Sequence, residues 1–152
     1  MSDKTSDSAT HAGEPDGGPA MPEAWGELRI SECLCRGTAS AIYRARDTVL
    51  DRDIALQLFA TSDDAEKQRL LDEGRTMAGI RHPNIVQVLG AAEHDGIVGL
   101  KMELIEGQSL HTVLEQQGPL DAAATTVIGG QLCAALAAIH AAGLPHRPID
   151  LH

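Results

Sequence analysis

The chain has 152 residues, enough for one core or for one lobe with part of another. Its net charge of −10 and its few aromatic residues argue against nucleic acid and against an anionic membrane surface as partners, because these reward basic patches and stacking platforms. The three cysteines are odd in number and follow no charged-then-apolar leader, which predicts reduced thiols and a cytoplasmic location.

The first 24 residues are predicted to form a disordered acidic tail. They are mainly Ser, Asp, Gly, Pro, Ala and Thr, and such a composition cannot offset the entropy of ordering the chain. The fold is therefore expected to begin near Trp25.

Three strands are predicted next, over 25–34, 41–46 and 54–58. The turn between the first two is rich in small residues, and Asp51-Arg52-Asp53 leads into the third. On the third strand, alternation directs Ile54, Leu56 and Leu58 to one face, and Ala55 and Gln57 to the other.

A helix over 61–79 follows, with Asp63 as its N-cap and Glu66 as the capping-box partner. Leu70, Glu73 and Met77 recur at helical spacing, so Glu73 is expected to point inward. A loop at His82-Pro83-Asn84 then leads to two more strands, over 85–89 and 97–103. The prediction is a five-stranded antiparallel sheet with one helix.

Two further helices are predicted, over 109–117 and 121–142, with Ser109 and Asp121 as their N-caps. The apolar stripe of the second consists of Val127, Leu132, Leu136 and Ile139. The window 127–144 is about long enough to span a bilayer. Gln131, His140 and the many Ala and Gly residues instead favour a buried helix in a soluble chain.

The order and spacing of these features resembles the bacterial type of serine/threonine protein kinase. The small-residue turn matches the family's Gly-rich loop, and Ile54-Ala55-Leu56-Gln57 matches its Val-Ala-Ile-Lys, with Gln57 in place of the lysine. The stretch from Met102 to Gly107 resembles the gatekeeper and hinge. His146-Arg147-Pro148 resembles the catalytic His-Arg-Asp, with Pro148 in place of the aspartate.

The resemblance implies an α+β fold with a kinase-like small lobe over 25–102, a hinge over 103–107 and a truncated start of the large lobe over 108–152. The nucleotide pocket that it implies consists of Cys35, Gly37, Ser40, Ala55, Gln57, Met102, Glu103 and Ile105. No catalytic position is intact; the degenerate ones are Gln57, Glu73, His146, Arg147 and Pro148. The metal-binding asparagine would fall one residue past His152.

Other residues are poor substitutes for the missing groups. Lys101 is expected to face away from the pocket if Met102 faces it, and Arg36 is read as a solvated loop residue. Cys33 and Cys35 are expected to share one face of a strand. No pair of Cys and His has the spacing of a zinc site, so no metal is predicted.

The leading hypothesis is a catalytically inactive pseudokinase that acts by binding a protein. ATP would bind weakly or not at all, and a protein partner or a second copy would cover the helix over 121–142. The alternative is a serine/threonine kinase that transfers the γ-phosphate of ATP to protein, either residually active or a fragment of a longer active chain. A decayed reading frame with no selected role is the third hypothesis.

Overall fold

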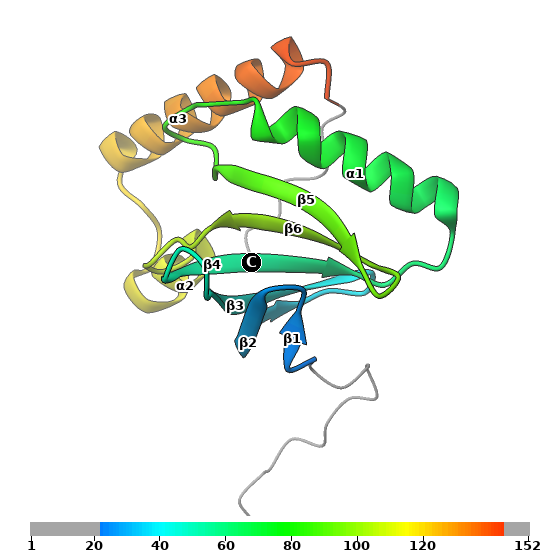
Figure 1. Ribbon diagram of the computed structural model, residues 1–152. Helices are drawn as coiled ribbons and strands as arrows, with labels where there is room; N and C mark the ends of the chain where they lie inside the picture. The colour runs from blue at the N-terminus through cyan, green and yellow to red at the C-terminus, as the bar shows by residue number, and fades with distance from the viewer. Residues whose placement is uncertain (1–21, 145–152) are drawn as a thin grey trace, which may run out of the picture.

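The computed structural model describes residues 22–144, which form a single antiparallel sheet and three helices (Figure 1). The sheet has six strands in the order β1-β2-β3-β4-β6-β5, one more than predicted. The strands are β1 (Ala24–Trp25), β2 (Leu28–Arg36), β3 (Ser40–Asp47), β4 (Arg52–Phe59), β5 (Val88–His94) and β6 (Ile97–Glu103). The helices are α1 (Asp64–Ala78), α2 (Leu110–Gln117) and α3 (Ala122–Ala141). The α+β class is confirmed, and residues 1–21 of the predicted tail lie outside the described part.

Two of the predicted strands differ from those observed. The stretch 25–34 is split at Gly26, whose φ of +56° makes a tight turn and leaves the two-residue β1 as an added strand. The strand predicted over 85–89 begins only at Val88 and extends to His94. Residues before it form a turn in which the Ile85 N–H donates to the His82 carbonyl oxygen and the Asn84 N–H donates to His82 Nδ1.

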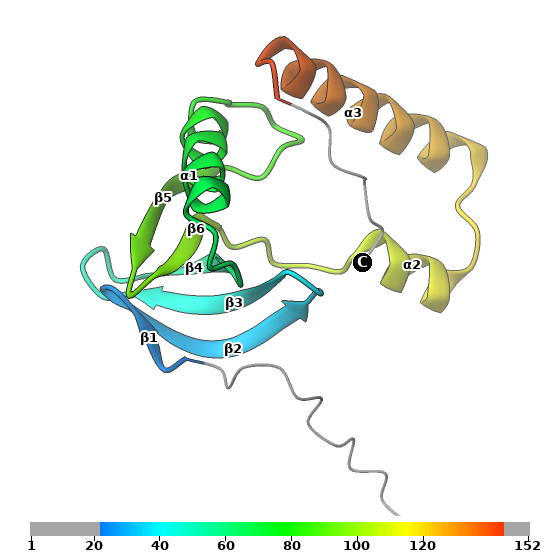
Figure 2. The ribbon, with the colours of Figure 1, turned by 90° about the vertical axis from the view of Figure 1, so that its right-hand side faces the viewer.

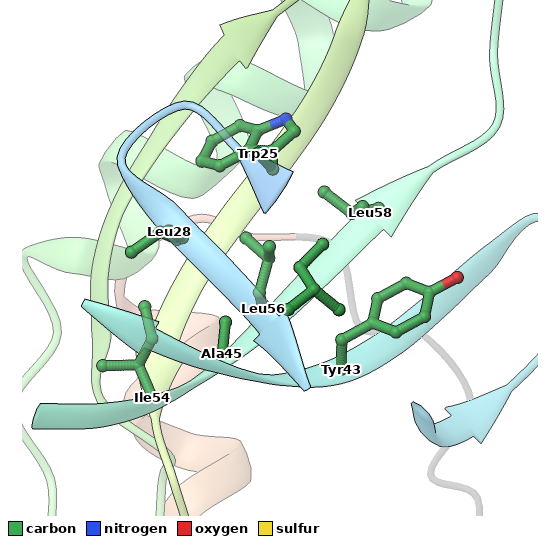
Figure 3. Close-up of a cluster of buried hydrophobic side chains, with 8 residues drawn as sticks. Trp25, Leu28, Tyr43, Ala45, Ile54, Leu56 and Leu58 are labelled. Atoms are coloured by element: carbon green, nitrogen blue, oxygen red, sulfur yellow. The ribbon is translucent and has the colours of Figure 1, made fainter. Parts of the chain in front are cut away.

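The largest cluster of buried side chains lies on one face of the curled sheet (Figure 3). Ile54, Leu56 and Leu58 of β4 enter it together, as the alternation on that strand predicts. Its other members are Trp25, Leu28, Ile30, Tyr43 and Ala45. This cluster ties β1, β2, β3 and β4 together.

Helix α1 packs across the opposite face of the sheet, against β5 and β6 (Figure 1). Leu70 is buried there with Phe59, Val98 and Leu100. The second buried residue of α1 is Gly74 rather than Glu73. A Cβ built on Gly74 would lie 2.5 Å from Leu100 Cδ2 and 2.7 Å from the Ala91 Cβ, so the missing side chain is what lets the helix approach the sheet.

The N-terminus of α1 is capped by Asp63, as predicted, through a 3.0 Å hydrogen bond from the Ala65 N–H to the carboxylate. The predicted capping box is wrong about the group that bonds to Glu66. The Glu66 carboxylate accepts from the Thr61 hydroxyl at 2.7 Å, and the Thr61 oxygen in turn accepts from the Asp63 N–H at 3.2 Å. A threonine hydroxyl therefore links the two residues that a direct capping box would join.

Replacing Gly74 by Ala is expected to lower the free energy of unfolding by about 1–3 kcal/mol, because the new methyl group has no room. The matched control is Gly129→Ala in α3, where a Cβ would meet no atom within 4 Å. There the change should stabilise the helix by about 0.5–1 kcal/mol. Urea unfolding followed by far-ultraviolet circular dichroism measures both variants. Equal effects of the two substitutions would contradict the proposed packing of α1.

Helices α2 and α3 follow the sheet through an extended segment and make no extensive contact with it (Figure 2). Ser109 and Asp121 cap them as predicted, accepting from the Thr112 and Ala124 N–H groups. The sequence predicts that α3 is buried, and this prediction is wrong: Ala135 is its only buried residue among residues 22–144. By length and composition alone, α3 could also cross a membrane.

Candidate functional site

The face of the sheet opposite the large cluster carries an apolar patch beside the start of the segment that leads to α2. Ala55 of β4 and Met102 of β6 are cross-strand partners, and both are buried together with Val88. Ile42 and Leu104 pack against them from either side. We call Ile42, Ala55, Met102 and Leu104 the apolar roof, because a flat apolar ring could lie under it.

Gln57, two residues along β4 from Ala55, does not bond to Glu73. Its side-chain amide donates a 3.0 Å hydrogen bond to the Ser40 hydroxyl across the neighbouring strand. Glu73 instead lines a surface hollow that α1 shares with Leu144, with Arg69, Asp72 and Thr76 as the other lining residues. The residues of α1 that are buried against the sheet are Leu70 and Gly74, and the Gln57 amide has Ser40 as its partner.

The turn between β2 and β3 is closed by its own backbone. The Gly37 N–H donates to the Ser40 carbonyl oxygen at 2.9 Å, and the Ala60 N–H donates to the Ala39 carbonyl oxygen at 3.0 Å. The second bond ties the turn to the end of β4. The Gly37 amide is thus already used within the protein and is not free to meet an anion.

Cys33 and Cys35 do not share a face, contrary to the prediction. A register shift separates them, so that Cys33 pairs with Tyr43 and Cys35 with Ile42. Because cross-strand partners lie on the same side of a sheet, Cys33 is on the side of the large cluster and Cys35 on the side of the roof. Both thiols are exposed.

The hinge prediction places Glu103 and Ile105 beside the roof. Glu103 ends β6 and is held twice by Gln87: its N–H donates to the Gln87 carbonyl oxygen at 3.0 Å, and its carboxylate accepts from the Gln87 N–H at 2.7 Å. Ile105 is exposed and packs in none of the buried clusters. The Glu103 side chain therefore has a structural partner and fixes the direction in which the chain leaves the sheet.

A group of alternating charges lies on the roof side of β3 and β4, and the sequence reasoning missed it. Arg44 and Arg46 both donate to the Asp53 carboxylate, at 2.9 Å and 3.1 Å. These two hydrogen bonds, that from Arg44 first, hold the pKa of Asp53 below its ordinary value. Arg46 also pairs with Asp51, and Arg44 lies 4.0 Å from Glu106. The signal that could have revealed the group is the alternation of Arg44 and Arg46 on one strand opposite Asp53 on the next.

The chain has three lysines, and neither of the two described ones can replace the missing charge at Gln57. Lys67, in the first turn of α1, pairs with Glu93 of β5, with 3.0 Å between Nζ and the carboxylate oxygen. Lys101 faces away from the roof, as predicted, and lines a hollow of about 200 Å³ with Trp25 and Asp47. Lys4, His146, Arg147 and Pro148 lie outside the described residues.

Between residues 22 and 144, no group of three or more His, Cys, Asp or Glu side chains is placed to hold a metal ion. The described part of the site thus combines the apolar roof, a turn closed by its backbone, and the neutral amide of Gln57 at the position where the Val-Ala-Ile-Lys motif has its lysine.

Comparison with protein families identifies one match over most of the chain. The family model described as protein kinase domain matches residues 28–151. The serine/threonine-protein kinase PknE of Mycobacterium tuberculosis is 35% identical over 128 residues, which cover 82% of this chain and 23% of PknE. PknD of the same organism is 34% identical over 137 residues, which cover 88% of this chain and 21% of PknD. The chain therefore spans less than a quarter of the length of these relatives.

Solved structures show the same fold. The kinase domain of Mycobacterium tuberculosis PknI, in a C20A mutant, superposes with a TM-score of 0.76 at 21% identity, over 86% of this chain and 56% of that one. The structure of Rad53 1-466 in complex with AMP-PNP gives a TM-score of 0.73 at 21% identity, over 82% of this chain and 33% of that one. At this level of identity the likeness establishes the architecture alone.

Proposed function

This chain belongs to the protein kinase family, and from that membership we propose that it is a kinase-like regulatory module that transfers no phosphate and acts by binding a protein. The observation that carries the proposal is Gln57. It stands where the family has the lysine that pairs with the nucleotide phosphates, and its amide is hydrogen-bonded to Ser40.

The phosphates and magnesium of ATP do not fit the residues that surround this position. An amide supplies no positive charge, and the Gly37 N–H is already bonded within the turn. Phosphoryl transfer depends on such positioning and charge neutralisation, so each missing group removes part of the catalysis.

The base of a nucleotide fits better than its phosphates. The apolar roof offers the kind of surface under which an adenine could lie, and the Rad53 structure contains the ATP analogue AMP-PNP. Without the charge at Gln57, binding of this kind should be weak. Nucleotide is therefore at most a minor ligand in the proposed function.

The proposed contact with a protein is α3. Val127 and Leu132 are 60% and 41% exposed on it, and a Cβ on Gly129 or Gly130 would meet no atom within 4 Å. Apolar side chains exposed along one helix offer a surface that another chain can cover, and the small residues allow another backbone to approach closely. The proposed occupant is another polypeptide, with a second copy of this chain as the case that is simplest to test. The cytoplasmic location stays a prediction.

Leu132→Glu should abolish the association. We expect the native chain of 152 residues to sediment as an assembly in analytical ultracentrifugation, or to bind a hydrophobic dye where it is monomeric. The variant should sediment as a monomer and bind less dye, because a charge cannot be buried at an apolar contact without large cost.

Val49→Glu is the matched control, since Val49 is 66% exposed in the turn before β4 and should affect neither readout. A native chain that is well folded, monomeric and free of dye would contradict the proposed contact through α3.

A further inference from the structure

A second cavity lies on the side of the sheet that faces away from the apolar roof. Its volume is about 270 Å³, and its walls combine side chains of β3, β4 and β6 with the end of β2 and the turn after it, where Arg36 and Thr38 add polar groups. Tyr43 and Leu58 reach it from the large buried cluster, and Ile97 lies on the opposite wall. Gly37 and Ser40 also line it, so the turn between β2 and β3 separates this cavity from the candidate nucleotide side.

Tyr43 gives the cavity a specific polar group. The residue as a whole is only 4% exposed, and its side chain lines the cavity. Figure 3 shows this hydroxyl directed away from the centre of the cluster, on the Leu58 side. No side-chain oxygen of the described residues is both buried and without a hydrogen-bond partner, so the Tyr43 hydroxyl is accessible from the cavity and can donate to a molecule there.

We propose that the cavity binds a small, mainly apolar molecule that carries one hydrogen-bond acceptor, to which the Tyr43 hydroxyl donates. The volume suits a ligand rather than a single water, and binding pockets for small molecules combine apolar walls with few polar groups in this way. Because Gly37 and Ser40 form part of the wall, the ligand favours the closed form of the turn. By reciprocity, a change that opens the turn weakens the binding of the ligand.

The competing occupant is the N-terminal segment, since Pro22 lies at the wall of the cavity. Residues 1–21 contain no Leu, Ile, Val, Phe, Tyr or Trp, and their only large apolar side chains are Met1 and Met21. A segment of that composition gains little from an apolar cavity. The observations therefore favour a separate small molecule.

The experiment uses acetophenone and ethylbenzene as matched probes of the full chain, followed by nuclear magnetic resonance of the Tyr43, Leu58 and Ile97 signals. The two molecules have similar shapes, but only acetophenone carries an acceptor. We expect both to perturb these signals, and acetophenone to bind more tightly. Tyr43→Phe should lower the affinity for acetophenone about fivefold and leave the affinity for ethylbenzene unchanged, because the substitution removes one hydrogen bond and keeps the ring.

Ala41→Leu fills the cavity from β3, where Ala41 lines the wall, and should abolish binding of both probes. The proposal is overturned if neither probe perturbs the cavity signals in the native chain, or if Tyr43→Phe weakens both probes equally. It is also overturned if binding occurs only after residues 2–21 are deleted, because the chain's own segment would then be the occupant.

Discussion

Incubation of the native chain with magnesium ATP and a serine-containing peptide should yield no phosphate transfer above the background of a protein-free control. Kinases of this family turn over about 1–100 times per second. Loss of one electrostatic donor, here the lysine replaced by Gln57, costs about a hundred- to a thousandfold. Loss of a catalytic base costs about a hundred- to ten-thousandfold, and the resemblance of His146-Arg147-Pro148 to the family motif predicts that loss at Pro148.

The matched variants are Gln57→Lys and Pro148→Asp, alone and combined. Groups that act as a unit are not additive, so each single variant should stay near background. A gain with the double variant would assign the loss to these two positions, and a silent double variant would show that these two positions alone do not account for it. Transfer by the native chain at the rate of an ordinary kinase would refute the proposed lack of catalysis.

Trp25→Ala should lower the free energy of unfolding by about 3–5 kcal/mol, the range for a large buried aromatic residue. Trp25 is 4% exposed, and its indole N–H donates to the Ile97 carbonyl oxygen at 3.1 Å. Its ring packs edge-on to His94 with centroids 4.4 Å apart. Since domains of this kind have about 5–15 kcal/mol of stability, the loss should be large in urea unfolding followed by circular dichroism.

Gly99 offers an independent check on the same contact. A Cβ there would lie 2.6 Å from the Trp25 ring, so Gly99→Ala should destabilise the native chain. In the Trp25→Ala background that cost should disappear, because the obstructing ring is gone. A Trp25→Ala variant within 1 kcal/mol of the native chain, or additive effects of the two changes, would refute the role of Trp25.

Local patterns in the sequence were sufficient to predict the strands and caps that depend on near neighbours. The faces of β4 were right because alternation is fixed by the backbone of one strand. The caps Asp63, Ser109 and Asp121 were right because each bonds to an N–H two or three residues away. The order of these elements also led to the correct family.

Features that depend on packing between elements were missed. Helical spacing allows either Glu73 or Gly74 to face the sheet, and the close approach of Leu100 and Ala91 selects the glycine. The faces of Cys33 and Cys35 depend on a register shift that follows from pairing with β3. The hydrogen bond from Gln57 to Ser40 likewise requires the register between β3 and β4. The exposure of α3 depends on what lies around it, which its composition does not reveal.

The register shifts in β2 and β5 also affect how the sheet meets other sheets. Among residues 22–144, β2 beyond Ile30 pairs with no strand on its outer side, and β5 is the edge on the other side. Long regular edges invite intermolecular strand addition and aggregation. Shifts interrupt β2 near Ser31 and Leu34 and β5 near Leu89, so neither edge offers a continuous ladder of hydrogen-bonding groups. The same irregularities that redirect Cys35 thus help to keep this sheet from polymerising through its edges.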